Sequence, residues 1–99
     1  MSEDVLLEAA EALPAPTRDM HRAIGALCED LAALDADNQR VEACTDPELR
    51  RVLVHRADAS RKQVAMLLEW MRRRDTRLDK ELKDALFKAG PIVAQFHYE

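Results

Sequence analysis

The feature that most constrains the fold is a short break, Thr45 to Glu48, between two long segments that carry apolar residues at helical spacing. The break has the pattern of a capping box. The Thr45 hydroxyl can accept a hydrogen bond from the Glu48 amide, the Glu48 carboxylate can reach back, and Pro47 fits the first helical turn. A second helix therefore begins directly after the first one ends. Because the connection is short, the pattern predicts an antiparallel helical hairpin.

The two predicted long helices each carry one apolar stripe. The first helix is expected from Thr17, as N-cap, to about Ala43, and its stripe has heptad spacing with one polar interruption. The second is expected from about Asp46 through Arg74. The stripe of the first helix consists of Met20, Ile24, Leu27, Leu31, Leu34, Asn38 and Val41, and that of the second is centred on Ala57, Ser60, Val64, Leu67 and Met71.

Shorter segments flank this hairpin. Residues 1–13 form an amphipathic arm, expected to be helical from Ser2, and the prolines at 14 and 16 end it. A break near Asp75 precedes a third helical stretch to Ala89, which Gly90 and Pro91 should end. The expected organisation is an arm at 1–13, a helical hairpin region at 17–89 and a tail at 90–99.

The composition favours helix packed on helix, and it favours more than one copy. The chain is 47% hydrophobic but has only four aromatic residues, so leucine, valine, alanine and methionine must supply the core. Two helices alone leave the far side of each apolar stripe in water. We therefore expect an all-α homodimer in which two hairpins form a four-helix bundle, and we expect an isolated subunit to be unstable.

The distribution of charged residues and the length of the apolar runs exclude several classes of function. Residues 1–48 carry 12 acidic and 3 basic residues, whereas residues 49–99 carry 7 acidic and 12 basic residues, which is typical of two helices that attract each other. The basic run at 72–77 is followed by acidic residues and lacks interleaved aromatic residues, so no nucleic-acid binding is expected. No apolar run is long enough for a membrane.

The N-terminal residues and the cysteines indicate a cytoplasmic protein. The N-terminus has acidic residues where a signal peptide needs basic ones. Cys28 and Cys44 are too far apart for a paired metal-ligand spacing, and on one helix they cannot form a disulfide. Both are expected to be free thiols.

Metal sites in four-helix bundles use inward carboxylates together with a Glu-x-x-His pair, and this sequence contains no Glu-x-x-His. The nearest substitutes are His55 and Asp58, which share one helix face, and the heptad-related acids Asp30 and Asp37. These four are weak candidates for metal ligands, and the alternative is that they are solvated surface charges. No nucleophilic triad or phosphate-binding loop is present.

Three stretches together resemble a known family: HRAIGALCEDLAALDADNQRVEACTDPEL, VLVHRADASRKQVAMLLEWMRR and LFKAGPI. They are similar to the encapsulated ferritins, the two-helix ferritin-like proteins of encapsulin nanocompartments. The resemblance implies a hairpin that dimerises into a four-helix bundle, and dimers that assemble into a decameric ring. It also implies a di-iron ferroxidase centre at the dimer interface, built from a first-helix Glu and a second-helix Glu-x-x-His of each subunit.

By this resemblance, the family's site positions have changed in the present chain. The first-helix Glu corresponds to Asp30, and the Glu-x-x-His corresponds to Ser60 and Gln63 with two basic residues between them. A tyrosine near the family site corresponds to Asp37. Glu29 and His55 match the family. The chain also lacks the family's Gly-Ser-Leu targeting tail and stops at Phe96-His97-Tyr98-Glu99, which argues against cargo loading by that route.

Three hypotheses about function follow. The first is a non-catalytic oligomer that has lost the ferroxidase ligands, needs no cofactor and acts in structure, regulation or complex assembly related to iron storage. The second is an iron-oxidising enzyme with iron or another divalent cation at a relocated site such as Asp30, Asp37 and His55. The third is an adaptor that binds a small polar guest beside Ser60 and Gln63. The expected location is the cytoplasm or a protein nanocompartment, with an encapsulin shell or another protein complex as a further partner.

Overall fold

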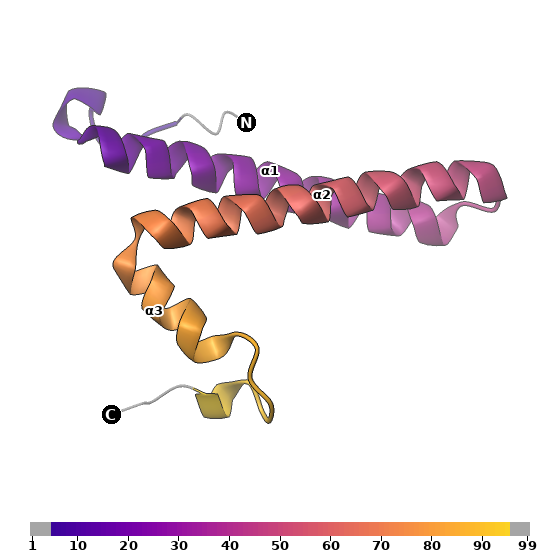
Figure 1. Cartoon of the computed structure of the whole chain (residues 1–99). Helices are drawn as coiled ribbons and strands as arrows, with labels where there is room; N and C mark the ends of the chain where they lie inside the picture. The colour runs from indigo at the N-terminus through magenta and orange to yellow at the C-terminus, as the bar shows by residue number, and fades with distance from the viewer. Residues whose placement is uncertain (1–4, 96–99) are drawn as a thin grey trace.

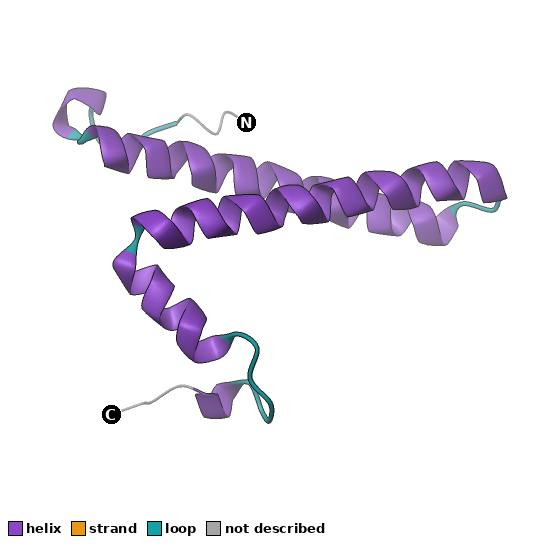
Figure 2. Cartoon of the chain, in the orientation of Figure 1, coloured by secondary structure: helices purple, strands orange, loops and turns teal. Residues whose placement is uncertain are grey.

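The computed structural model of the chain describes residues 5–95, and all regular structure in this range is helical. Two long helices, α1 (Ala15–Ala43) and α2 (Pro47–Arg74), run antiparallel and contact each other along the hairpin (Figures 1 and 2). A shorter helix, α3 (Thr76–Ala85), leaves the end of α2 at a steep angle. Single 3₁₀ turns lie at Ala10–Ala12 and Val93–Gln95. The predicted all-α hairpin is confirmed.

The tight connection forms, although its cap differs from the prediction. Asp46, not Thr45, is the N-cap of α2, and its Oδ2 accepts from the Leu49 amide at 2.7 Å. A carboxylate is the stronger partner here because its charge also favours the positive end of the helix dipole. Pro47 occupies the first helical position, as expected.

The other helix boundaries also differ in detail. Helix α1 begins at Ala15 instead of after Thr17, because Pro16 is tolerated within the first turn. The predicted break at Asp75 is confirmed, and the Asp75 carboxylate caps α3 by accepting from the amides of residues 77 and 78. Helix α3 ends at Ala85, so the expected end at Ala89 with a Gly90 cap was wrong.

The N-terminal arm is not an α-helix over the residues that can be described. Residues 5–9 are irregular, and Val5 and Leu7 are exposed. A helix this short needs tertiary packing for stability, and the arm packs its apolar side chains poorly. The expected helix start at Ser2 and the final residues 96–99 lie outside the described range.

The hairpin buries little within one chain. Among the described residues, the buried apolar residues are Ala23, Leu53, Ala57 and Met71. The radius of gyration is 17.4 Å, whereas a compact domain of this length would have about 13 Å. None of the described helices has the length and apolar character needed to span a membrane.

Candidate functional site

Three contacts between α1 and α2 fix the register of the hairpin. Arg50 Nε donates to the Val41 carbonyl oxygen at 3.1 Å, Arg56 Nε lies 3.3 Å from Asp37 Oδ2, and Arg61 Nη2 donates to Asn38 Oδ1 at 3.2 Å. In an antiparallel pair, two turns back along α1 correspond to two turns forward along α2. Asp30 therefore lies at the level of Gln63, with Ser60 one turn away on α2.

The three residues that the sequence resemblance assigns to the family's ligand positions, Asp30, Ser60 and Gln63, thus lie near one level of the hairpin. Asp30 and Ser60 are half-buried and Gln63 is exposed. Within residues 5–95, none of these three side chains forms a hydrogen bond or ion pair with another side chain or with the backbone. The site available to a partner consequently offers one carboxylate, one hydroxyl and one amide per chain.

Asp37 lies deeper than the sequence indicates. Its residue exposure is 1%, and both carboxylate oxygens are engaged by arginines. Oδ1 accepts from Arg40 Nη1 at 2.8 Å, and Oδ2 faces Arg56 Nε at 3.3 Å. The expectation of a solvated edge charge was wrong for Asp37, because the turn of α1 that carries it faces α2.

His55 and Asp58 share one face of α2, as expected, and both are exposed. Asp58 Oδ1 accepts from Arg61 Nη1 at 2.7 Å. Within the described residues, no three side chains of His, Cys, Asp or Glu are close enough together to hold a metal ion. Asp30, Asp37, His55 and Asp58 are therefore not brought together as one ligand set within a single chain.

The donor set at Asp30, Ser60 and Gln63 does not fit a di-iron centre. Ferritin-like di-iron sites take carboxylates from the facing helices and an imidazole from each Glu-x-x-His. Two copies of this chain would contribute two Asp30 carboxylates, while Ser60 and Gln63 are neutral. The charge of two divalent cations would therefore remain largely uncompensated.

A second charged cluster joins α2 to α3. The Arg72 guanidinium makes a bidentate pair with Glu69, both distances being 2.7 Å, and its Nη1 lies 2.5 Å from Asp79 Oδ1. Lys83 Nζ lies 3.0 Å from Asp79 Oδ2, and Arg73 also contacts Glu69. We refer to Glu69, Arg72, Asp79 and Lys83 as the Arg72 cluster.

Charge pairing in the Arg72 cluster shifts the pKa of Glu69, Asp79 and Arg72. Hydrogen bonds from Arg72 and then from Arg73 lower the pKa of Glu69 to about 2. The pKa of Asp79 is lowered by Arg72 and then by Lys83. The pKa of Arg72 is raised, first by its hydrogen bonds to Glu69. Glu69, Arg72 and Asp79 are therefore ionised near neutral pH.

Sequence reasoning did not find either arginine-centred group. The spacing of Asp37 to Arg40 and of Glu69 to Arg72 was a readable signal, since residues three apart meet on a helix. The contact between Asp37 and Arg56 needs the hairpin register, and the contact between Arg72 and Asp79 needs the bend at Asp75. No sequence spacing supplies either one.

Comparison with known proteins identifies the family. Residues 5–89 match the model of one protein family, described as EncFtn-like. The chain belongs to the EncFtn-like family. The resemblance found in the sequence is thereby confirmed.

Two curated relatives of this EncFtn-like chain are named as ferritin-like. An encapsulated ferritin-like protein of Rhodospirillum rubrum is 45% identical over 87 residues, a stretch that covers 88% of this chain and 62% of the relative. A ferritin-like protein of Thermotoga maritima is 36% identical over 86 residues, covering 87% of this chain and 75% of the relative. The match thus spans less than two thirds of the Rhodospirillum rubrum protein.

A solved structure supports the same fold. The crystal structure of a protein from Nitrosomonas europaea matches with a TM-score of 0.85 and 53% identity, and the match covers 90% of this chain and 98% of that one. The ferritin-like helical fold predicted for this EncFtn-like chain is therefore confirmed. Its expected dimer and ring stay predictions.

Proposed function

We propose that this EncFtn-like chain is a non-catalytic homo-oligomer, in which the ferritin-like scaffold is kept and the ferroxidase centre is lost. The observation that carries the proposal is the donor set at one level of the hairpin. Asp30 is the single carboxylate there, and Ser60 and Gln63 occupy the positions that the family resemblance assigns to Glu and His. Such a site closes by hydrogen bonds and packing and needs no iron cofactor.

The proposed partner at this site is a second copy of the chain. Large apolar side chains remain exposed on the hairpin, namely Ile24 and Leu31 of α1 and Leu49, Val52 and Met66 of α2. In a two-hairpin bundle these residues would be covered, and the half-buried Asp30 could accept a hydrogen bond from the Gln63 amide of the other copy. We refer to this apolar surface as the hairpin face.

The role that suits such an oligomer is structural, regulatory or in complex assembly. Similarity to an encapsulated ferritin-like protein supports a place within or beside a protein compartment related to iron storage. A decameric ring of dimers remains the proposed assembly.

The test is aerobic oxidation of added Fe(II) by the purified oligomer, compared with a buffer blank and with Asp30→Ala. We expect the wild type to match the blank and Asp30→Ala to change nothing. Oxidation faster than the blank that requires Asp30 would overturn the proposal in favour of a relocated metal site.

A restoring variant sharpens this test. Ser60→Glu combined with Gln63→His returns a carboxylate and an imidazole one turn apart while keeping Asp30. We expect this double variant to bind iron and to oxidise Fe(II) above the wild-type rate, and further addition of Asp30→Ala to abolish the gain. A double variant that folds and assembles but gains no iron would show that the substitutions at 60 and 63 do not explain the lost chemistry.

A further inference from the structure

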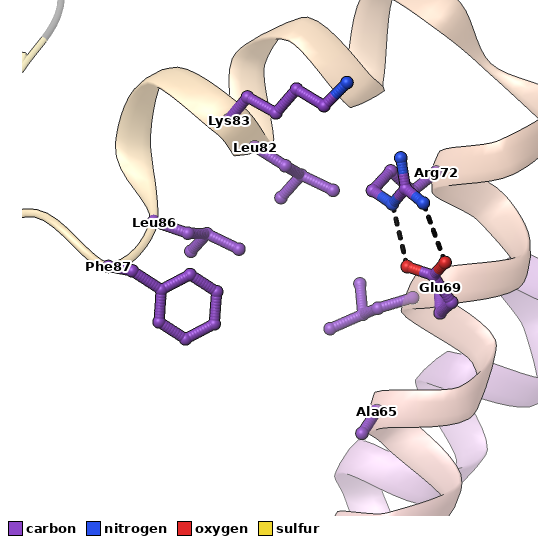
Figure 3. A pocket seen from close by; sticks show the side chains of 8 residues that line it. Ala65, Glu69, Arg72, Leu82, Lys83, Leu86 and Phe87 are labelled. Atoms are coloured by element: carbon purple, nitrogen blue, oxygen red, sulfur yellow. Dashed lines mark hydrogen bonds and ion pairs between the residues drawn. The ribbon is translucent and has the colours of Figure 1, made fainter.

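The cavities of the chain differ in the chemistry of their walls. An open groove between α2 and α3 is lined mainly by apolar side chains, and its charged residues are paired within the Arg72 cluster (Figure 3). A smaller cavity, which we call the α1 pocket, lies where the N-terminal arm passes the first turns of α1 (Figure 1). Its four lining residues are Leu6, Arg18, His21 and Arg22. Three of these four side chains carry nitrogen donors and none is acidic, so the walls of the α1 pocket suit an anion.

The α1 pocket is small and lies on the outer side of α1. Asp37 faces α2, where it meets Arg56, and at about 100° per residue His21 is turned about 160° away from Asp37. The pocket is therefore separate from Asp30, which shares the side of α1 that carries Asp37. The volume of the pocket is about 170 Å³, whereas sites for drug-sized molecules begin at about 300 Å³. It consequently suits a small ion or one functional group of a larger molecule.

His21 carries an unpaired polar atom. Within residues 5–95, its Nε2 is the one buried side-chain nitrogen or oxygen without a hydrogen-bond partner. A buried nitrogen normally keeps a partner, because it otherwise loses its hydration without compensation. In the tautomer that carries its proton on Nε2, this atom would donate to a bound anion. Because His21 lines the α1 pocket, a ligand held in that pocket is the candidate partner.

The charges around the α1 pocket also favour an anion. The start of an α-helix is the positive end of its dipole and normally attracts acidic residues, yet the first turn of α1 contains none. Arg18 lies close to this end, and Arg22 follows one turn later. Asp19 offsets part of the charge, since its Oδ1 accepts from Arg22 Nη1 at 2.7 Å. Arg18 is half-buried and forms no ion pair with any residue that the structure describes, so its charge stays available to a ligand.

We infer that the α1 pocket binds a phosphate group, with Arg18 and Arg22 donating to its oxygens and His21 Nε2 supplying a further donor. Guanidinium groups suit a tetrahedral oxyanion because each presents paired N–H donors in a fixed plane. Leu6 forms the apolar wall of the pocket. The phosphate group belongs either to inorganic phosphate or to the end of a phosphate monoester. This inference goes beyond the proposed function and does not depend on it, because the pocket and Asp30 lie on different sides of α1.

The test is isothermal titration calorimetry of the full chain with sodium phosphate, at constant pH and at an ionic strength fixed with sodium chloride. We expect saturable binding to the wild type, and we expect Arg18→Gln and His21→Phe each to weaken it at least about tenfold, because each removes one donor to the anion. Arg51→Gln is the matched control. It removes the same charge at an exposed position near the hairpin turn and should bind phosphate like the wild type. Circular dichroism checks that each variant is folded, and Arg18→Gln alone carries the test if His21→Phe is not.

Three results would overturn the inference. The first is a wild-type chain that shows no saturable binding of phosphate, which would leave water as the partner of His21 Nε2. The second is equal binding by the wild type and by Arg18→Gln. The third concerns a wider depression that His21 also lines, together with Arg74. If Arg74→Gln removes phosphate binding and Arg18→Gln does not, the anion binds in that depression and not in the α1 pocket.

Parallel titrations identify the source of the phosphate group. If glycerol phosphate binds as tightly as inorganic phosphate and loses affinity in Arg18→Gln, the pocket accepts a phosphate monoester. If inorganic phosphate alone binds, the ligand is the free ion, and either result supports the inference. Acetate that binds as tightly as phosphate would overturn the assignment to a tetrahedral oxyanion. None of these titrations contains iron, so their outcome is independent of the Fe(II) oxidation test.

Discussion

At the scale of single residues, Asp37 is the position where structure and sequence differ most. It is the single buried charged side chain within residues 5–95, and it is held by Arg40 from its own helix and by Arg56 from α2. Both arginine side chains are more than half exposed, so their charges remain hydrated. The cost of burying this charge falls mainly on the carboxylate, which is fully paired.

Replacing Asp37 by asparagine should lower the free energy of unfolding by about 1–3 kcal/mol, because the buried site loses a charge-assisted hydrogen bond from Arg40 and an ion pair with Arg56 at nearly constant shape. The measurement is urea unfolding at constant protein concentration. Asp58→Asn is the matched control, since Asp58 pairs with an arginine three residues away but is exposed; it should cost about 0–1 kcal/mol. Equal losses for both variants would contradict the structural account of Asp37.

At the scale of elements, the junction of α2 and α3 depends on charge more than on a core. Asp75 connects the two helices and caps the second, and no residue of α3 is buried. The Arg72 cluster supplies the ion pairs that set the direction of α3. The stability of the junction between α2 and α3 should therefore depend on the ionisation of the acidic residues in the Arg72 cluster.

This dependence predicts an acid-sensitive contribution from Glu69. Its pKa is lowered to about 2 from an ordinary value of 4.5. The stabilisation that ionised Glu69 gives the folded protein is therefore complete above about pH 4.5, and it is lost as the pH falls through about 2. The difference in urea midpoint between the wild type and Glu69→Gln should be constant near neutral pH and shrink towards zero in acid.

The control for this titration is Glu81→Gln. Glu81 is exposed, and the ion pair that it makes with Lys80 is long, at 3.9 Å. We expect its substitution to leave the urea midpoint nearly unchanged at every pH, and added salt to reduce the effect of Glu69→Gln. A Glu69→Gln difference that grows as the pH falls would refute the assigned direction of the pKa shift.

At the scale of the whole molecule, the chain is extended and leaves much apolar surface exposed. Its principal dimensions are 50 × 41 × 19 Å, and large apolar side chains remain exposed on more than one side. A domain of this size buries only a moderate part of its surface even when it is compact. We therefore propose that association with a second copy supplies stability that a single hairpin lacks.

Thermal unfolding should accordingly depend on protein concentration. A tenfold increase favours a dimer by about 1.4 kcal/mol, which corresponds to a rise in Tm of about 3–6 °C. The measurement is circular dichroism at 222 nm over a wide range of concentration. A Tm that stays constant on dilution would mean that one chain is stable by itself and would contradict the need for a second copy.

The sequence by itself determined the elements and the family. Heptad spacing, the prolines and the short break before Pro47 sufficed for two long helices, their antiparallel order and the bend at Asp75, because these features act through local backbone geometry. The replacement of the family's ligands by Ser60 and Gln63, which the sequence resemblance implies, stays a prediction. The sequence did not decide between Thr45 and Asp46 as the N-cap of α2, and it did not predict the early end of α3. In both places several neighbouring residues could cap or end the helix.

Tertiary structure decided which side chains meet. It placed Asp37 inside the hairpin, Arg56 against it, and Asp79 against Arg72, contacts that depend on the rotation of one helix relative to the next. It also divided the apolar residues of α2 between an internal seam, the hairpin face and the groove beside α3, which one heptad pattern cannot distinguish. Periodicity specifies that a face is apolar, whereas only the positions of the neighbouring helices specify what covers it.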